Sequence, residues 1–245
     1  MNIIIHGSTG RMGQNLIALT EQSHTLAAAV SIEQETNAAE KKYHSLPEFN
    51  GAADLLIDFS HHTAIGAVLD YAKAKKLPVV IGTTGHTAEE LSAIADAAKE
   101  IPVFHAGNYS LGIAVLMDMA RRTAKAFPDA EVEIIETHHD QKLDVPSGTA
   151  LMLAKAVKDE HPEATYNIGR HENGKRDPKE IGIHSLRMGN VVGIHEVIIA
   201  TGTQTITLKH EAHDRKLFAE GAMVAAEWLV NQKPGLYNME TMLGG

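Results

Sequence analysis

The segment EIIETHHDQKLDVPSGTA, residues 133–150, gathers side chains that can move protons and hold anions. They are His138, His139, Lys142, Ser147, Gly148 and Thr149. Period-two alternation predicts a strand that points the two histidines to opposite faces, and a helix then begins near the serine. A histidine transfers protons near neutral pH, and a lysine neutralises a substrate carboxylate or donates a proton. A helix N-terminus can hold a second anion. The pattern predicts a site for a small dianionic substrate; the alternative is a surface histidine pair before a capped helix.

A second candidate site is the glycine-rich loop GSTGRMG, residues 7–13, which follows the apolar run NIIIH and opens a helical pattern. Its spacing, G-x-x-G-x-x-G, is a variant of the dinucleotide fingerprint G-x-G-x-x-G. Glycines let the backbone approach a pyrophosphate closely, and the helix N-terminus offers unpaired N–H groups. The loop predicts a dinucleotide site, against the alternative of a tight turn that binds nothing.

An acidic residue about 20 positions beyond such a loop normally binds the adenosine ribose. Glu33 lies at that spacing, whereas Ser31 directly follows the second apolar run, so both stay candidates for this contact. No Arg or Lys lies between Met12 and Lys41, so no clamp for a 2′-phosphate is evident. A weak preference for NADH, or no strong preference between NADH and NADPH, is the resulting hypothesis.

Two more loops follow predicted strands. They are IGTTG, residues 81–85, and HAGNYS, residues 105–110. Ligands of doubly wound sheets bind beyond the carboxyl ends of the strands, so both loops are candidates to line a nicotinamide site. The alternative for each is a turn with a capping Thr or Ser.

Composition excludes several classes of protein. Apolar residues make up 44% and charged residues 22% of 245 residues, as in ordinary globular proteins. The chain has 31 acidic against 22 basic residues and a net charge of -9, which argues against nucleic acid as a partner. It has no cysteine, which excludes disulfides and thiolate metal sites. It has no long apolar run and no leader-like start at MNIIIHG, so we expect a cytoplasmic protein without a membrane span.

Histidine is abundant, with 15 residues, yet we expect no metal site. The richest segments are HHTAI at 61–65, HEV at 195–197 and HEAHD at 210–214. None has the H-E-x-x-H spacing that places two imidazoles on one helix face. Solvated or hydrogen-bonded histidines are the expected outcome.

The N-terminal elements that must position these loops alternate short apolar runs with helical patterns. This alternation predicts a Rossmann-like, doubly wound parallel α/β sheet with right-handed crossovers. The expected strands are 2–5, 26–30, 55–57, 79–81 and 103–104, and the expected helices are 15–22, 64–75 and 88–99.

After about residue 110 the pattern changes to α+β. The expected elements are a helix at 112–126, a strand at 131–139, a helix at 149–159, an exposed loop at 167–179, three strands within 181–210 and a helix at 214–230. Gly-containing turns between the three strands leave no room for helical crossovers, which predicts antiparallel pairing. We therefore expect a dinucleotide-binding domain made of residues 1–109 plus 215–245, with an inserted α+β domain at 110–214.

The order of the motifs resembles one family. The motifs are GSTGRMG, DFS at 58–60, IGTTG, NYSLGI at 108–113, the 133–150 segment and IGIHSLRMGNVVGIHEV at 181–197. In this order the chain closely resembles the dihydrodipicolinate reductase family. The resemblance implies reduction of 4-hydroxy-tetrahydrodipicolinate to tetrahydrodipicolinate by NADH or NADPH with loss of water, in bacterial lysine (diaminopimelate) biosynthesis. It also implies a homotetramer built by strands of the second domain.

The resemblance also implies roles for particular residues. His138 matches the general acid and Lys142 its partner in proton donation. His139, Gly148 and Thr149 match positions at which the family contacts the substrate carboxylates. The cofactor contacts match Gly7, Ser8, Thr9, Gly10, Arg11, Met12, Gly82, Thr83, Thr84, Ala106, Gly107, Asn108 and Tyr109, while Ser31 stands where many members carry the acidic ribose ligand.

Two other functions stay open. One is a different Rossmann-type oxidoreductase of a small anionic substrate. The other is a dinucleotide-sensing regulator, for which the acidic charge disfavours a DNA-binding element.

Overall fold

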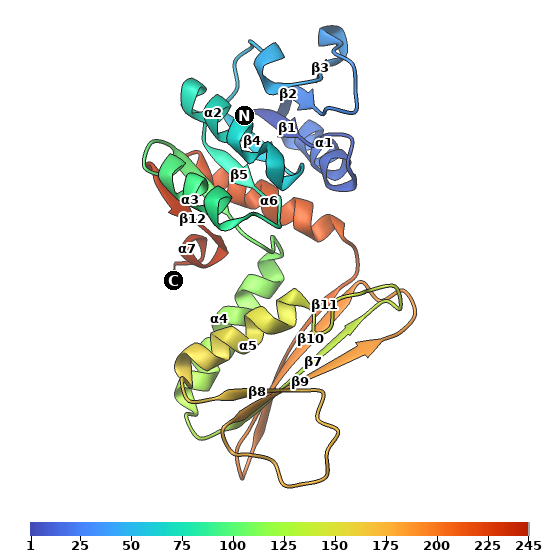
Figure 1. Cartoon of the computed structure of the whole chain (residues 1–245), viewed down its shortest axis with the longest axis vertical. Helices are drawn as coiled ribbons and strands as arrows, with labels where there is room; N and C mark the ends of the chain where they lie inside the picture. Colours follow the sequence, from blue (N-terminus) through green and yellow to red (C-terminus); the bar gives the residue numbers. More distant parts are fainter. Residues whose placement is uncertain (245) are drawn as a thin grey trace. The chain divides into compact units, whose positions relative to one another are not determined.

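The computed structural model describes residues 1–244, which divide into two compact units (Figure 1). Unit 1 comprises Met1–Ser110 together with the C-terminal segment from Lys216, and unit 2 comprises Leu111–Arg215. The sequence boundaries expected at 109/110 and 214/215 lie within one residue of these divisions.

Unit 1 is built on a seven-stranded parallel sheet of order β12-β6-β5-β4-β1-β2-β3. The strands are β1 (Asn2–His6), β2 (Thr25–Val30), β3 (Lys42–Tyr43), β4 (Leu55–Asp58), β5 (Val79–Ile81), β6 (Pro102–His105) and β12 (Gly235–Tyr237). The central strands are buried on both faces, which explains their uninterrupted apolar sequences. The five predicted strands are present; β3 and β12 are too short to show a periodicity, and both lie at sheet edges.

Helices cover both faces of this sheet. They are α1 (Arg11–Ser23), α2 (Ile65–Lys75), α3 (Ala88–Ala97), α6 (Lys216–Leu229) and α7 (Met239–Met242), with 3-10 turns η1 (Ala38–Glu40), η2 (Leu46–Glu48) and η3 (His62–Ala64). One core layer joins α2 and α3 to the sheet, whereas α1 contacts α6, and α6 packs on β4, β5 and β6. Thr87 and Glu90 form a capping box that fixes the start of α3.

Unit 2 is a five-stranded mixed sheet of order β11-β10-β7-β9-β8, with two helices. The strands are β7 (Glu131–His138), β8 (Thr165–Ile168), β9 (Glu180–Arg187), β10 (Gly193–Ala200) and β11 (Thr205–Ala212); the helices are α4 (Leu111–Ala126) and α5 (Gly148–Glu160). Both helices pack on one face, around a core that includes Ile134, Leu153 and Val197. The opposite face of the sheet carries no helix of unit 2 (Figure 1).

The pairing of β9 differs from the sequence prediction. β10 pairs antiparallel with β11 and with β7, as expected for antiparallel strands. β9, however, runs parallel to its two neighbours, β7 and β8. Because β7 pairs with β9 on one side and with β10 on the other, β9 and β10 are not adjacent. The prediction was wrong because the Gly189-containing segment 188–192 was interpreted as a hairpin turn, whereas it carries the chain across β7. β8 also occupies the beginning of the segment predicted as an exposed loop.

Candidate functional site

The predicted cofactor residues of unit 1 gather at one edge of its sheet. The chain leaves β1 for β2 on one side, and β4 flanks β1 on the other, so the strand order reverses at β1. Ligands of such sheets bind outside the carboxyl ends of the strands at this point. The glycine loop follows β1, Ser31 follows β2, Gly82 follows β5 and Ala106 follows β6.

Two glycines of the loop are required by close backbone approaches. Gly7 has φ +82°, and a Cβ there would lie 2.2 Å from the carbonyl oxygen of Phe59. A Cβ on Gly13 would lie 2.2 Å from the carbonyl oxygen of Gly7. Gly10 is the N-cap of α1 and, having no side chain, makes no capping bond to the N–H groups of the first turn. This arrangement fits a bound pyrophosphate.

The two candidate ribose ligands both contact the glycine loop. The hydroxyl of Thr9 lies 2.8 Å from Ser31 Oγ and donates to Glu33 Oε2 at 2.7 Å. Ser31 is buried and accepts a bond from the Glu33 backbone N–H at 3.2 Å, whereas Glu33 is exposed. Both residues therefore stand beside the loop, and only Glu33 offers a charge there.

A buried hydrogen-bond network that the sequence did not predict lies under this edge. Asp58 is 1% exposed and lies 2.7 Å from His6 Nδ1; it accepts the hydroxyls of Ser60 and Thr83, each at 2.6 Å. Thr83 Oγ1 also accepts from the Ser60 N–H at 2.9 Å. Thr83 is thereby oriented, while the next residue, Thr84, is exposed. In the sequence, only the DFS motif at 58–60 pointed to Asp58.

In the loop after β6 the Tyr109 side chain is buried, whereas the preceding residues are at least partly exposed. Tyr109 is 3% exposed, and its hydroxyl donates to the carbonyl oxygens of Ile81 at 2.8 Å and of Phe104 at 3.3 Å. Burial raises the pKa of this phenol well above its usual value. Asn108 Oδ1 accepts from the Ser110 N–H at 2.8 Å, which shapes the turn. Gly107 is exposed, and Ala106 and Asn108 are partly exposed.

The candidate proton donor of unit 2 is held by a buried carboxylate. His138 Nδ1 lies 2.5 Å from Glu136 Oε2, and Arg187 donates to both oxygens of that carboxylate, at 2.9 and 2.8 Å. Burial raises the pKa of Glu136, but bonds from Arg187 and other donors outweigh it and bring the pKa to about 2. Burial lowers the pKa of His138, and Glu136 opposes that shift.

Beside this group, Ser147 forms the N-cap of α5. Its Oγ accepts from the Ala150 N–H at 3.1 Å and lies 3.2 Å from His195 Nε2. Burial, with the neighbouring His138, lowers the pKa of His195 to about 4. The predicted carboxylate ligands Gly148 and Thr149 form the first residues of this helix.

The other predicted residues of unit 2 have charged neighbours. His139 Nε2 lies 3.1 Å from an Arg215 nitrogen, and Lys142 Nζ lies 2.8 Å from Asp144 Oδ1. Arg187, His195 and Arg215 were not predicted as site residues, although the first two lie within the 181–197 motif. Glu136 could have been found from its spacing, because it shares a strand face with His138.

Residues 1–244 contain no group of three or more His, Cys, Asp or Glu side chains that could hold a metal ion. In the same residues, no helix is long and apolar enough to cross a bilayer.

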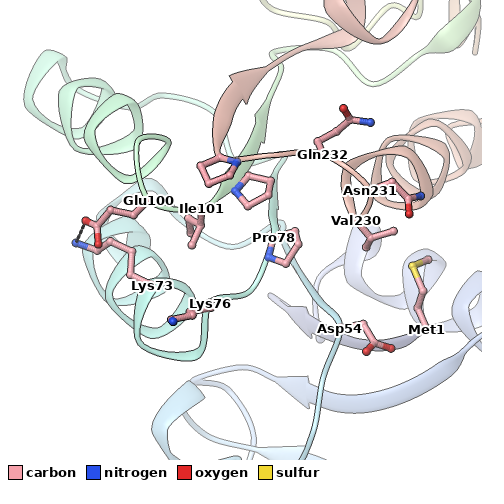
Figure 2. Close-up of a pocket in the computed structure, with 12 residues that line it drawn as sticks. Met1, Asp54, Lys73, Lys76, Pro78, Glu100, Ile101, Val230, Asn231 and Gln232 are labelled. Carbon is pink, nitrogen blue, oxygen red and sulfur yellow. Dashed lines mark ion pairs between the residues drawn. The ribbon is translucent and has the colours of Figure 1, made fainter.

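A pocket of about 760 Å³ opens at the opposite, amino-terminal edge of the unit 1 sheet. Figure 2 shows Asp54, Pro78 and Ile101 around it, with Lys73 paired to Glu100 at its rim. None of the predicted site residues lines it, and ligands of this fold bind at the other edge. We therefore do not place the cofactor there.

Family comparisons decide between the open functions. The N-terminal model of dihydrodipicolinate reductase matches residues 1–109, and the C-terminal model matches residues 112–243. The chain belongs to the dihydrodipicolinate reductase family. It is 42% identical over 246 residues to the 4-hydroxy-tetrahydrodipicolinate reductase of Caldanaerobacter subterraneus subsp. tengcongensis, covering 99% of this chain and 98% of that relative. The predicted family and its class, an NAD(P)H-dependent oxidoreductase, are confirmed.

Other members and a solved structure agree. The 4-hydroxy-tetrahydrodipicolinate reductase of Akkermansia muciniphila is 40% identical over 249 residues, covering 100% of this chain and 98% of the relative. The dipicolinate-bound dihydrodipicolinate reductase from Paenisporosarcina sp. TG-14 has a TM-score of 0.82 and 24% identity, with 98% of each chain covered. This similarity confirms the predicted fold class.

Proposed function

We propose that the chain reduces 4-hydroxy-tetrahydrodipicolinate to tetrahydrodipicolinate with loss of water, in bacterial lysine (diaminopimelate) biosynthesis. The observation that carries this proposal is the match of both halves of one reductase family to residues 1–109 and 112–243. A structural neighbour that binds dipicolinate supports a small dicarboxylate substrate.

In this reaction NADH or NADPH supplies the hydride, and the residues of unit 2 supply protons and bind carboxylates. The substrate loses its 4-hydroxyl as water, the ring receives the hydride, and His138 assists protonation through Nε2. Lys142 is the second proton donor. One carboxylate is held by His139, and the other by Gly148 and Thr149 at the start of α5, where N–H groups and the helix dipole favour an anion.

The cofactor lies against the glycine loop of unit 1 in this proposal. The close approaches at Gly7 and Gly13 and the open N-terminus of α1 fit a pyrophosphate. Glu33 accepts the ribose hydroxyls in place of Thr9, and its charge disfavours a 2′-phosphate, which gives a weak preference for NADH. The remaining contacts are those of Ser8, Arg11, Met12, Gly82, Thr83, Thr84, Ala106, Gly107, Asn108 and Tyr109.

We also propose a cytoplasmic homotetramer assembled through the helix-free sheet face of unit 2. Ile135, Ile194 and Ile198 point to this face and are only partly buried, and Leu186 is 44% exposed. These apolar side chains lie on that face among Glu133, His184 and Glu196, and a partly exposed apolar group of this kind marks a surface for contact with another protein. Sedimentation equilibrium tests the assembly: a tetramer is expected, and a monomer for Leu186→Glu. A wild-type chain that sediments as a monomer contradicts this part of the proposal.

The activity test mixes the protein with freshly generated 4-hydroxy-tetrahydrodipicolinate and either NADH or NADPH, and follows the loss of nicotinamide absorbance. Turnover with either cofactor is the expected result. Its absence would favour another anionic substrate, or a regulator that binds the dinucleotide without turnover. His138→Gln should lower kcat about a hundredfold and leave the cofactor KM unchanged, because a general acid contributes about 10²–10⁴ to the rate.

A further inference from the structure

The side chain of Glu136 has a role that the reductase reaction alone does not assign. It is fully buried, and four donors surround its two oxygens. Oε2 lies 2.5 Å from His138 Nδ1 and 2.9 Å from Arg187 Nη1; Oε1 lies 2.8 Å from Arg187 Nη2 and 3.1 Å from the Ser147 N–H. A carboxylate, which only accepts hydrogen bonds, satisfies all four donors at once.

We propose that Glu136, clamped by Arg187, is the positioning residue of the proton donor His138: it accepts a hydrogen bond from Nδ1–H and leaves Nε2–H to give its proton to the substrate. The inference rests on the proposed role of His138. Glu136 touches no reacting atom itself, since it lies behind the imidazole and acts through it.

The surroundings of Nε2 agree with this assignment. A Cβ on Gly193 would lie only 3.1 Å from His138 Nε2 and 3.5 Å from Cδ2, so glycine keeps the space beside that nitrogen open. No residue of 1–244 forms a hydrogen bond with Nε2, whereas Nδ1 is bonded to Glu136. Nδ1 is therefore held by Glu136, and Nε2 is the nitrogen left for proton donation.

The charges that face His138 come from four segments. Glu136 lies on the same strand, Arg187 on β9, His195 on β10 and Lys142 in the loop after β7, and of these only Glu136 is negative. Burial lowers the pKa of His138, the carboxylate of Glu136 raises it, and Lys142 and Arg187 lower it. His195, with a pKa of about 4, is neutral at neutral pH.

Loss of the Glu136 charge therefore has a defined direction. Without it, the pKa of His138 falls further, and the imidazolium that donates the proton is lost at lower pH. Because the acid form is required for the reaction, activity that declines as pH rises must decline earlier in such a variant. A purely structural role for Glu136 would not move this decline.

The first experiment uses the wild-type protein and no substrate. Long-range ¹H–¹⁵N NMR of the imidazoles reports which nitrogen of neutral His138 carries the proton. The expected tautomer has the proton on Nδ1. A proton on Nε2 would overturn the proposal whether or not the chain reduces 4-hydroxy-tetrahydrodipicolinate, so the two failures are distinguishable.

The second experiment compares pH profiles of kcat for Glu136→Gln, Glu136→Asp and Glu180→Gln. The control residue, Glu180, is 8% exposed and paired with Arg170 and Arg176 in the same sheet, but it does not contact His138. Glu136→Gln should lower kcat about tenfold or more and move the decline to lower pH by about one unit, with the cofactor KM unchanged.

Glu136→Asp keeps the charge but shortens the side chain, so it should lower kcat with a smaller movement of the decline. Glu180→Gln should leave the profile at its wild-type position. An unmoved profile in Glu136→Gln, or the same movement in Glu180→Gln, would contradict the proposal. Should Glu136→Gln fail to fold, the wild-type tautomer still decides.

Discussion

Replacement of Gly13 by alanine sets two effects of known size against each other. Gly13 lies inside helix α1, where alanine is intrinsically better than glycine by about 1 kcal/mol. Its Cβ, however, would lie 2.2 Å from the Gly7 carbonyl oxygen and 2.7 Å from Ser8 Cα. Ordinary van der Waals contact begins near 3.4 Å. The loop and the helix must therefore separate by about 1 Å.

The steric effect should exceed the helical one. Overpacking costs about 1–3 kcal/mol where side chains can rearrange, and sometimes more. Here the atoms that collide belong to the backbone of Gly7 and Ser8, which has no alternative rotamer. We expect a net loss of about 2 kcal/mol in the free energy of unfolding, and a fall of about 4–8 °C in Tm.

Gly10→Ala is the matched control in the same loop. Its Cβ would lie 3.4 Å from the Gly7 carbonyl oxygen, and its φ of -70° suits any residue. As an N-cap change it should cost no more than about 1 kcal/mol. Its methyl group would stand at the proposed pyrophosphate site, so cofactor affinity should fall while stability stays near that of the wild type.

The assay is urea unfolding followed by tryptophan fluorescence. The chain has one tryptophan, Trp228, which lies in α6 and contacts the rings of Phe104 and Tyr237, so its emission reports on unit 1. A Gly13→Ala midpoint equal to or above the wild-type value would refute the steric argument. Equal losses in both variants would refute the assignment of the collision to position 13.

Three further predictions concern charge. Glu33→Gln should raise the kcat/KM ratio of NADPH to NADH, because a carboxylate beside the ribose repels a 2′-phosphate; an unchanged ratio removes Glu33 from the cofactor site. Asp144→Asn should lower the substrate KM by up to about fivefold, since it frees Lys142 from a pair worth about 0.2–1 kcal/mol, and a raised KM would contradict this. Folding lowers the pKa of His195 from 6.5 to about 4. The contribution of this neutral histidine to the free energy of unfolding should therefore be fully present above pH 6.5, and about 3 kcal/mol of it should be lost as the pH drops to 4. Urea titrations of the wild type and His195→Asn should show a steeper decline in the wild type; equal slopes would rule out His195 as the cause.

Much of unit 1 was predictable, since each of its buried strands is a short apolar run bounded by turn residues. The spacing of Glu33 from the glycine loop predicted a residue beside that loop, and Glu33 accepts a hydrogen bond from Thr9 there. It did not separate Glu33 from Ser31, because both bond to the same hydroxyl of Thr9. The pair between His6 and Asp58 depends on register, since the two residues face each other across β1 and β4, 52 positions apart.

The same physical reason explains why Arg187 was missed in unit 2. His138 and Arg187 are register partners across the parallel strands β7 and β9. A β9–β10 hairpin, as predicted from the sequence, would have placed β10 beside β9 and left Arg187 without a route to Glu136. Period-two alternation identifies which residues of one strand share a face. Only the strand order identifies which residues of the neighbouring strands lie beside them.

Strand order also resolves a conflict in charge. A net charge of -9 repels a dicarboxylate at long range, and Glu136 adds a negative charge directly behind the proposed proton donor, His138. Arg187 binds both oxygens of Glu136, so that carboxylate is neutralised within the strand pair rather than opposed to the substrate. The charge of Glu136 then acts mainly on the imidazoles beside it, His138 and His195, rather than on groups farther away. Local pairing by register, rather than the overall charge of the chain, therefore decides which charges the proposed anion site of unit 2 presents.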